Sequence, residues 1–185
     1  MKTIWEEAAS FYEIDRLGVN FWPALPTGIT VHYTGDGDIR RVKQEMDKTK
    51  IGYHFLIDRD GSLHQTANLA KCVNHAGKAM WNGQSPNRTH LAVSVVSWGA
   101  LDDEMRTWAG KIINGTKRKG KFWDAATPAQ ERMLMHLLAS LMRDFAISAA
   151  NICGHDESAL PKGRKQDPGN IFTLTMPEIR KALSS

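Results

Sequence analysis

The sequence predicts an α/β protein, a single domain whose mixed central β-sheet is flanked by helices. Three observations lead to this prediction. Runs rich in β-branched residues at 28–34 and 91–99 are typical of buried strands. Two strand-like runs within 53–67 flank the turn sequence Arg-Asp-Gly at 59–61, which indicates a hairpin. An amphipathic helix follows Thr127, so strands and helices alternate along the chain.

The first half of the chain divides into four expected elements. Residues 1–27 form an irregular lead-in, with a short helix at 4–16 and two prolines further on. The strand at 28–34 leads into a helix at 36–48, where three apolar residues lie at helical spacing. The hairpin comes next.

The second half contains the clearest helix. Residues 100–126 are polar and are expected to form a loop or a second hairpin, with the basic sequence Lys-Arg-Lys-Gly-Lys at 117–121. The long helix opens with Thr-Pro-Ala-Gln at 127–130, which supplies a threonine cap, proline at the first helical position and glutamine at the third. Its apolar stripe is expected to face the core. A last helix starts near Pro177.

The composition is that of an ordinary soluble domain. The chain has 185 residues and 20.7 kDa, of which 42% are hydrophobic and 24% charged. We expect one domain over 1–185, with a core at about 28–183 and the lead-in at 1–27. The net charge of +4 favours anionic partners, such as nucleic acid or an acidic cell wall, without selecting between them.

No apolar run reaches the roughly 18 residues of a membrane span, so we expect no membrane partner. The first residues contain acids where a signal peptide has its apolar core, so no secretion signal is expected. Two cysteines, Cys72 and Cys153, are too few for a disulfide scaffold. They are expected to be reduced and buried, although one bridge between them remains an alternative.

Two of the seven histidines suggest a metal site. His32 interrupts a buried strand, where a polar ring needs a specific partner. His155 follows Cys153-Gly154 and precedes a loop rich in charges and turn formers. Catalytic zinc takes three protein ligands and leaves the fourth position for water, whose pKa falls from 15.7 to about 7. No HExxH or CxxC motif is present, so the spacing alone leaves the metal site open. The expected structural histidines are His54, His64, His90 and His136.

Six segments occur in an order known from one enzyme superfamily: GITVHYT, IGYHFLIDRDGSLHQT, NHAGKAMWNG, HLAVSVVSWG, TPAQ opening a helix, and GHDESALPKGRKQDPG. The chain thereby resembles the zinc-dependent N-acetylmuramoyl-L-alanine amidases. This superfamily includes phage lysozyme-type amidases, bacterial wall-recycling amidases and animal peptidoglycan recognition proteins. The resemblance covers roughly residues 28–172 and implies the amidase fold. The Tyr-His-Phe run before the Arg-Asp-Gly turn is most similar to the phage branch.

The resemblance implies a set of site residues. His32 and His155 match two zinc ligands, and Asp167 matches the third. Lys165 matches a lysine that stabilises the oxyanion of the transition state. Tyr53 matches a tyrosine that faces the metal-bound water. The next residues on its strand face, Phe55 and Ile57, are expected to hold the tyrosine ring in place.

Further matches and departures bear on the same site. His75, Gly77 and Trp81 match a His-Ala-Gly…Trp element at the rim of the substrate groove. The loop between the second and third ligands is slightly longer than usual, so Asp156 is kept as an alternative ligand. The recycling branch has a general-base Glu that, aligned on Gly99, falls at Val96.

The implied function is hydrolysis of the amide bond between N-acetylmuramic acid and L-alanine in peptidoglycan, with Zn²⁺ as cofactor, by a phage or prophage endolysin. The alternatives are a non-catalytic peptidoglycan-binding module and a cytoplasmic wall-recycling amidase. A basic-aromatic patch at 117–123 raises a nucleic-acid-binding alternative, but no motif accompanies it, so no nucleic-acid partner is expected. We expect a monomer that stays in the host bacterial cytoplasm until release and then acts on the wall in the periplasm.

Overall fold

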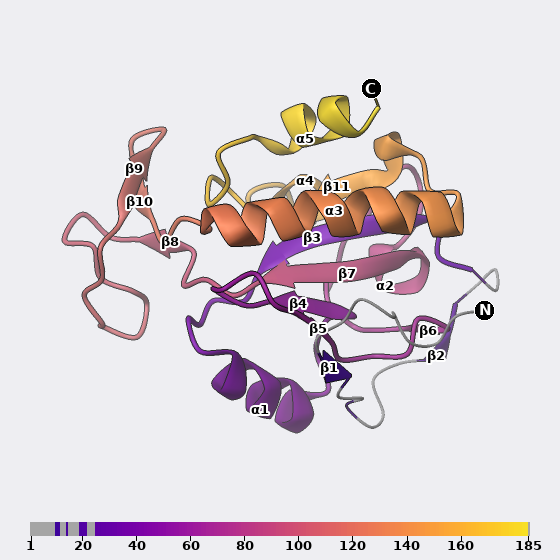
Figure 1. The fold of residues 1–185 in the computed structure, drawn as a ribbon, viewed down its shortest axis with the longest axis horizontal. Helices are drawn as coiled ribbons and strands as arrows, with labels where there is room; N and C mark the ends of the chain where they lie inside the picture. Colours follow the sequence, from indigo (N-terminus) through magenta and orange to yellow (C-terminus); the bar gives the residue numbers. More distant parts are fainter. Residues whose placement is uncertain (1–9, 12–13, 15–18, 22–24, 185) are drawn as a thin grey trace.

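A six-stranded sheet forms the centre of the computed structural model, which describes residues 10–11, 14, 19–21 and 25–184 (Figure 1). The strand order is β1-β5-β4-β7-β3-β11. The bounds are β1 Ser10–Phe11, β3 Gly28–Tyr33, β4 Phe55–Ile57, β5 Leu63–Gln65, β7 His90–Val95 and β11 Ile152–Gly154. A separate pair consists of β2 (Val19–Asn20) and β6 (Lys71–Cys72).

Parallel and antiparallel pairs share this sheet. β3 pairs in parallel with β7 and β11, whereas β4 pairs in parallel with β7 and antiparallel with β5. The turn between β4 and β5 contains Gly61, which has φ 88 and where a Cβ would make a tight contact of 3.0 Å with Ala129. Only glycine adopts that conformation without strain, which fixes the hairpin turn. The predicted mixed sheet and its hairpin are confirmed.

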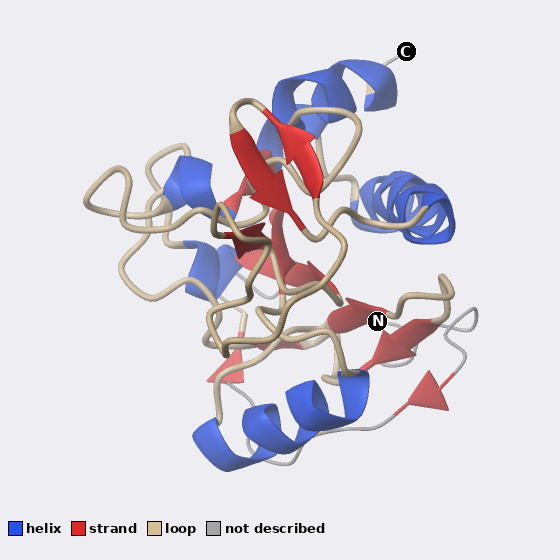
Figure 2. Cartoon of the chain, turned by 90° about the vertical axis from the view of Figure 1, so that its left-hand side faces the viewer, coloured by secondary structure: helices blue, strands red, loops and turns tan. Residues whose placement is uncertain are grey.

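Helices cover both faces of the sheet, as Figures 1 and 2 show. α3 (Pro128–Phe145) and α5 (Met176–Leu183) pack on one face, and α1 (Ile39–Thr49) packs on the other. Each face has its own apolar cluster, which explains why the central strands are buried on both sides. The shorter helices are α2 (Pro86–Thr89), η1 (Ala149–Asn151) and α4 (His155–Ser158).

The α3 helix begins where its capping signals predict. The Thr127 hydroxyl accepts the backbone N–H of Gln130 at 3.1 Å, and the Gln130 side chain accepts the N–H of Thr127 at 3.0 Å. Gln130 is fully buried, and its Nε2 donates to the carbonyl oxygens of Ile57 and Val96. The cap therefore anchors the helix to the carboxyl ends of β4 and β7. The leucines that fill the interface are Leu134, Leu137, Leu138 and Leu141.

The side chains of β3 alternate between the face of the sheet under α3 and the face under α1. Ile29 and Val31 belong to the cluster under α3. Successive side chains of a strand point to opposite faces, so Thr30 and His32 face the α1 side. His32 comes one residue before the end of β3, which places its ring at the carboxyl edge of the sheet.

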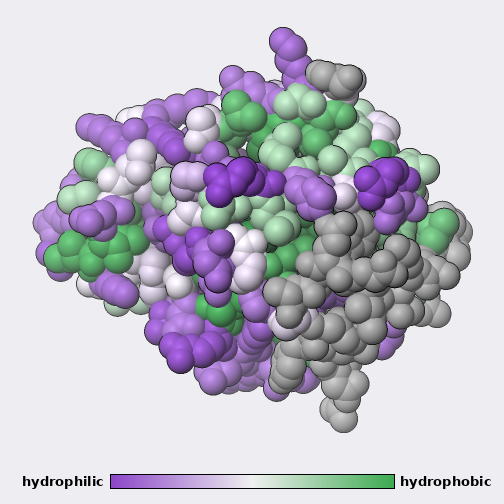
Figure 3. Space-filling view, in the orientation of Figure 1, coloured by the Kyte–Doolittle hydropathy of each residue, from purple (hydrophilic) through white to green (hydrophobic). Residues whose placement is uncertain are grey.

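A three-stranded arm projects from the domain at the left of Figure 1. It contains β8 (Ala100–Leu101), β9 (Thr116–Arg118) and β10 (Lys121–Trp123), in the order β8-β10-β9. β9 and β10 form the second hairpin that was one of two expectations for residues 100–126. Apolar side chains gather on this arm and over α3 and α5 in the space-filling view of Figure 3.

Two sequence expectations are settled within the described residues. Ser10–Phe11 form a strand, so the short helix expected at 4–16 is wrong there, and most of that range lies outside the described residues. Cys72 and Cys153 are free and buried, as expected, and burial raises the pKa of Cys153 to about 12. Within the described part of the chain, no helix has the length and apolar character that a bilayer crossing requires.

Two buried histidines make stability depend on pH. Burial lowers the pKa of His54 and of His90 to about 4, from the ordinary value of 6.5. The unfolded chain therefore takes up protons that the folded chain refuses, and the free energy of unfolding falls as pH drops from about 6.5 towards 4. Burial raises the pKa of Asp156 to about 6, which offsets part of this loss.

We expect urea unfolding, measured with a chelator present, to show a loss on the order of a few kcal/mol between about pH 7.5 and pH 4.5. A His90→Asn variant should have a shallower pH dependence, because it lacks one of the histidines whose pKa burial lowers. An equally steep dependence in this variant would contradict the assignment.

Candidate functional site

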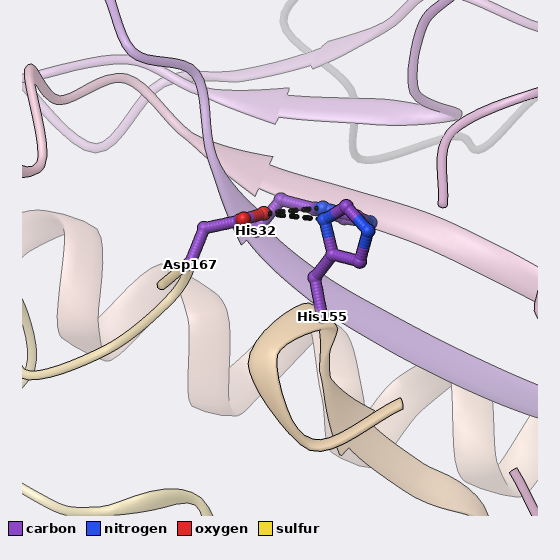
Figure 4. Close-up of side chains that lie close together, drawn as sticks. All are labelled: His32, His155 and Asp167. Atoms are coloured by element: carbon purple, nitrogen blue, oxygen red, sulfur yellow. Dashed lines mark hydrogen bonds and ion pairs between the residues drawn. The ribbon is translucent and has the colours of Figure 1, made fainter. Parts of the chain in front are cut away.

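Three side chains from distant parts of the sequence meet at the carboxyl edge of the sheet (Figure 4). His32 comes from β3, His155 is the first residue of α4, and Asp167 lies in the loop that follows. Asp167 Oδ2 lies 2.8 Å from His32 Nδ1 and 2.9 Å from His155 Nδ1. All three residues are buried. The structure thus brings together the three residues that the resemblance implied as metal ligands.

The pairing of β11 with β3 explains how His155 reaches His32. Gly154, the last residue of β11, lies opposite Val31 on β3. The residue after Val31 is His32 and the residue after Gly154 is His155, and the ring centroids of the two histidines are 4.7 Å apart. A Cβ on Gly154 would lie 2.3 Å from Asp156 Oδ1, so glycine is needed for the tight entry into α4.

The donor set fits zinc. Two imidazole nitrogens and one carboxylate oxygen are ligands that Zn²⁺ prefers, and three protein ligands leave a fourth position open. His155 Nε2 lies 2.9 Å from the carbonyl oxygen of Ala76, which can only accept, so Nε2 carries a proton. A neutral His155 therefore turns the lone pair of Nδ1 towards Asp167. A lone pair that faces a carboxylate needs a proton or a metal ion between them.

The electrostatics distinguish the two candidate carboxylates. Burial favours protonated Asp167, but the adjacent rings of His155 and His32 outweigh it and hold its pKa below the usual range. Burial and the neighbouring Glu157 raise the pKa of Asp156 to about 6. Asp156 donates its backbone N–H to the carbonyl of Asp167 and is outside the cluster. Asp167 is the carboxylate that the fold places with the histidines.

Tyr53 lies beside this cluster. Its ring centroid is 5.2 Å from that of His32, and burial raises the pKa of its hydroxyl above the ordinary value. The ring packs against the cluster on the α1 face, which includes Leu56. The expectation that Phe55 and Ile57 share its face and hold the ring is wrong, because both pack under α3. Tyr53 precedes β4, so strand alternation does not extend to it.

An open depression of about 430 Å³ gives access to these groups. His32, His155 and Asp167 lie at its base, with Tyr53 and the exposed Lys165 also in its lining. Burial lowers the pKa of His32, and the positive charge of Lys165 adds a smaller lowering. A buried polar cluster beside an open hollow is the arrangement expected of a hydrolytic metal centre.

Comparison with known families matches most of the chain to an enzyme family. The model of the Amidase_2 family, described as N-acetylmuramoyl-L-alanine amidase, matches residues 23–170. This chain belongs to the Amidase_2 family. The match contains all three residues of the cluster, Tyr53 and Lys165, and the resemblance found in the sequence motifs is therefore confirmed at the level of the family.

Relatives of this Amidase_2 chain include phage endolysins. The endolysin of Escherichia phage T7 is 28% identical over 125 residues, which cover 68% of this chain and 66% of that protein. The endolysin of Enterobacteria phage T3 is 28% identical over 111 residues, 60% of this chain and 58% of that protein. The matched part thus spans at most about two thirds of these curated relatives.

A solved amidase shares the fold. The N-acetylmuramyl-L-alanine amidase AmiD from E. coli, solved with the substrate anhydro-N-acetylmuramic acid-L-Ala-D-gamma-Glu-L-Lys, has a TM-score of 0.65 and 20% identity. The superposition covers 84% of this chain and 56% of AmiD. The predicted amidase fold is therefore confirmed.

The three residues expected at the groove rim do not stay together in this Amidase_2 domain. His75 lines the depression, but it is buried. Gly77 packs near the guanidinium group of Arg164, outside the depression. Trp81 donates its indole N–H to the carbonyl of Ala150 and is likewise not in the lining. Substrate binding by these three residues stays a prediction.

Two neighbours of the site had no signal in the sequence. Ser94 lies opposite His32 on β7 and is fully buried, and its hydroxyl has no hydrogen-bond partner among the described residues. The alignment on Gly99 pointed to Val96, but the register places Ser94 next to His32. Neither residue is a carboxylate, so this strand supplies no general base there. Arg164 donates to the carbonyls of Ala76 and Lys78 and thereby links the loop between α4 and Asp167 to residues 76–78.

Proposed function

We propose that this chain hydrolyses the amide bond between N-acetylmuramic acid and L-alanine in peptidoglycan, with zinc held by His32, His155 and Asp167. One observation carries the proposal: a buried His-His-Asp cluster at the base of an open depression, beside Tyr53 and Lys165. Membership of the Amidase_2 family supports peptidoglycan as the substrate.

Zinc bound there would polarise the scissile carbonyl and lower the pKa of water from 15.7 to about 7. The protein's own side chains would position the attacking water and stabilise the negative charge of the oxyanion. The ring of Tyr53 lies 5.2 Å from that of His32 between centroids, and its hydroxyl would hydrogen-bond the attacking water. Lys165 lines the same depression, and its ammonium group would stabilise the oxyanion of the tetrahedral intermediate.

The experiment is a digestion of purified peptidoglycan followed by mass spectrometry. Amidase activity releases stem peptides with an L-alanine N-terminus and leaves glycan strands with peptide-free muramic acid. Binding to the wall without these products would instead favour a non-catalytic peptidoglycan-binding module. Cleavage of small soluble muropeptides in preference to intact wall would favour the wall-recycling alternative.

We further propose the role of a phage or prophage endolysin that remains in the host cytoplasm until release and then reaches the wall in the periplasm. The T7 and T3 endolysins among the relatives support this role. Added to intact Gram-negative cells, the protein should leave turbidity unchanged, and outer-membrane permeabilisation should allow lysis. Lysis that does not follow permeabilisation would contradict the proposal.

Tyr53→Phe tests how the proton is handled. This change keeps the ring and its packing against the apolar cluster on the α1 face but removes the hydroxyl. We expect activity to fall by roughly 10²-fold or more, the usual scale for losing a positioned proton-handling group. Zinc content and wall binding should be unchanged, as measured by metal analysis and co-sedimentation. A fully active variant would mean that another group handles the proton.

The matched control is Tyr33→Phe. Tyr33 also lines the depression, but it packs against the apolar cluster under α3 and is not in ring contact with His32. Its activity should stay within about twofold of the wild type. An equal loss in both variants would point to a general effect of removing a hydroxyl from the rim.

A further inference from the structure

A chain of buried contacts continues from the histidine cluster into the protein. His32 Nε2 lies 2.9 Å from His75 Nδ1, and His75 Nε2 lies 3.2 Å from the carbonyl oxygen of Pro86. The two rings are perpendicular, with centroids 5.1 Å apart. Both histidines are buried, at 1% and 6% exposure. No water is needed to link these groups.

The direction of each hydrogen bond follows from the carbonyl at the end of the chain. The oxygen of Pro86 can only accept, so His75 Nε2 must carry the proton. In a neutral His75 the other nitrogen, Nδ1, is then an acceptor, and His32 Nε2 must donate to it. This leaves the lone pair of His32 Nδ1 directed at the cluster. That nitrogen is the one that lies 2.8 Å from Asp167.

Ala76, the residue after His75, fixes the proton position of His155 in the same way. The carbonyl oxygen of Ala76 lies 2.9 Å from His155 Nε2, so it fixes the proton there and frees Nδ1. His75 and Ala76 thus orient both histidines of the cluster. Each acts on the nitrogen that faces away from Asp167.

Asn87, at the start of the short α2 helix, holds this segment in place. Its Oδ1 accepts the backbone N–H groups of His75 and Ala76 at 3.0 and 2.8 Å. Its Nδ2 donates to the carbonyl of Gly77 at 2.7 Å. Both polar atoms of this side chain are therefore used on the backbone of three consecutive residues.

We infer that His75 and Asn87 are positioning residues of the metal site: they fix the ring orientation and proton position of His32 and His155, and His75 does not bind substrate. Both ring nitrogens of His75 are engaged within the protein, which leaves none for a ligand. The inference rests on the proposed function only for the identity of the metal. Partners of this kind typically contribute 10–100-fold to metal affinity.

The test measures zinc affinity rather than catalysis, by titration of the metal-free protein against a competing chelator. We expect His75→Gln and Asn87→Ala to weaken zinc binding by roughly 10–100-fold. With zinc at saturation, the KM for peptidoglycan fragments should stay within about twofold of the wild type. The titration needs no turnover. It therefore tests the positioning role of His75 and Asn87 even if the protein does not cleave peptidoglycan.

His54→Gln is the matched control. His54 is also a buried histidine with both ring nitrogens engaged, by the carbonyl of Lys71 and the N–H of Ala92, but it lies outside the cluster. Its zinc affinity should equal that of the wild type. A loss in the control as large as in His75→Gln would overturn the inference, since the effect would then reflect general destabilisation.

Two other results would also overturn it. If His75→Gln abolishes zinc binding as completely as His32→Ala, then His75 is a ligand. If zinc affinity is unchanged and KM rises, then His75 binds substrate. Nitrogen-15 NMR of the zinc-loaded wild type tests the proton positions without any variant. His32 and His75 should each carry their proton on Nε2. The opposite tautomer in either ring would contradict the inference.

Discussion

A His32→Ala variant is expected to lose bound zinc and to cleave peptidoglycan no faster than background. His32 supplies one of three ligand atoms, and a site with two remaining ligands binds zinc far more weakly. The wild type, purified without added metal, should contain close to one equivalent of zinc. Metal analysis and release of L-alanine-terminated stems check both parts. A variant that keeps its metal and activity would show that the site is elsewhere.

The two acidic residues beside His155 offer a matched pair for the third ligand. Asp167→Asn removes the carboxylate that contacts both histidines, so zinc should be lost. Asp156→Asn changes a carboxylate outside the cluster and should leave the zinc content unchanged. The reverse result would transfer the third ligand to Asp156.

Lys165→Ala is expected to lower kcat by a factor of about 10²–10³ while KM changes little. The loss falls on kcat because the oxyanion exists only in the transition state. Zinc content should be unchanged, since a protonated lysine is not a metal ligand. Steady-state kinetics on a soluble muropeptide separate the two constants. A rise in KM alone would make Lys165 a binding residue.

Lys162→Ala is the control for this measurement. Lys162 is exposed in the same loop, but it is not in the lining of the depression and its ammonium group contacts the carbonyl of Glu157. It should retain full activity. A comparable loss in both variants would indicate that the net charge of the loop matters rather than one placed ammonium group.

Elements whose own residues contain capping or turn signals could be predicted from the sequence. The α3 helix starts at its threonine cap, and the hairpin turns at Gly61, because capping and turn preferences act over a few residues. The strand at Ser10–Phe11 had no such signal. It exists because it pairs with β5, and a tertiary contact of this kind overrides local preference.

The site could be predicted only in part from local context. The contexts of His32 and His155 suggested a metal site, but Asp167 was identified only by matching the residues of a family. The parallel pairing of β3 with β11 brings the two histidines together. Ser94 depends on strand register, and Asn87 acts through contacts with the backbone of residues 75–77. Neither register nor such contacts can be derived from spacing in one sequence.

The place of β11 beside β3 has a consequence for the folding reaction. His32 and Asp167 are 135 positions apart, and the strand that delivers His155 is the last to be synthesised of those in the central sheet that the structure describes. Bringing these ends together requires closing a long loop, which is entropically costly and is slow in chains rich in non-local contacts. We therefore expect the zinc site to assemble after most of the sheet has formed. Added zinc should slow the unfolding arm of a chevron plot and leave the refolding arm almost unchanged.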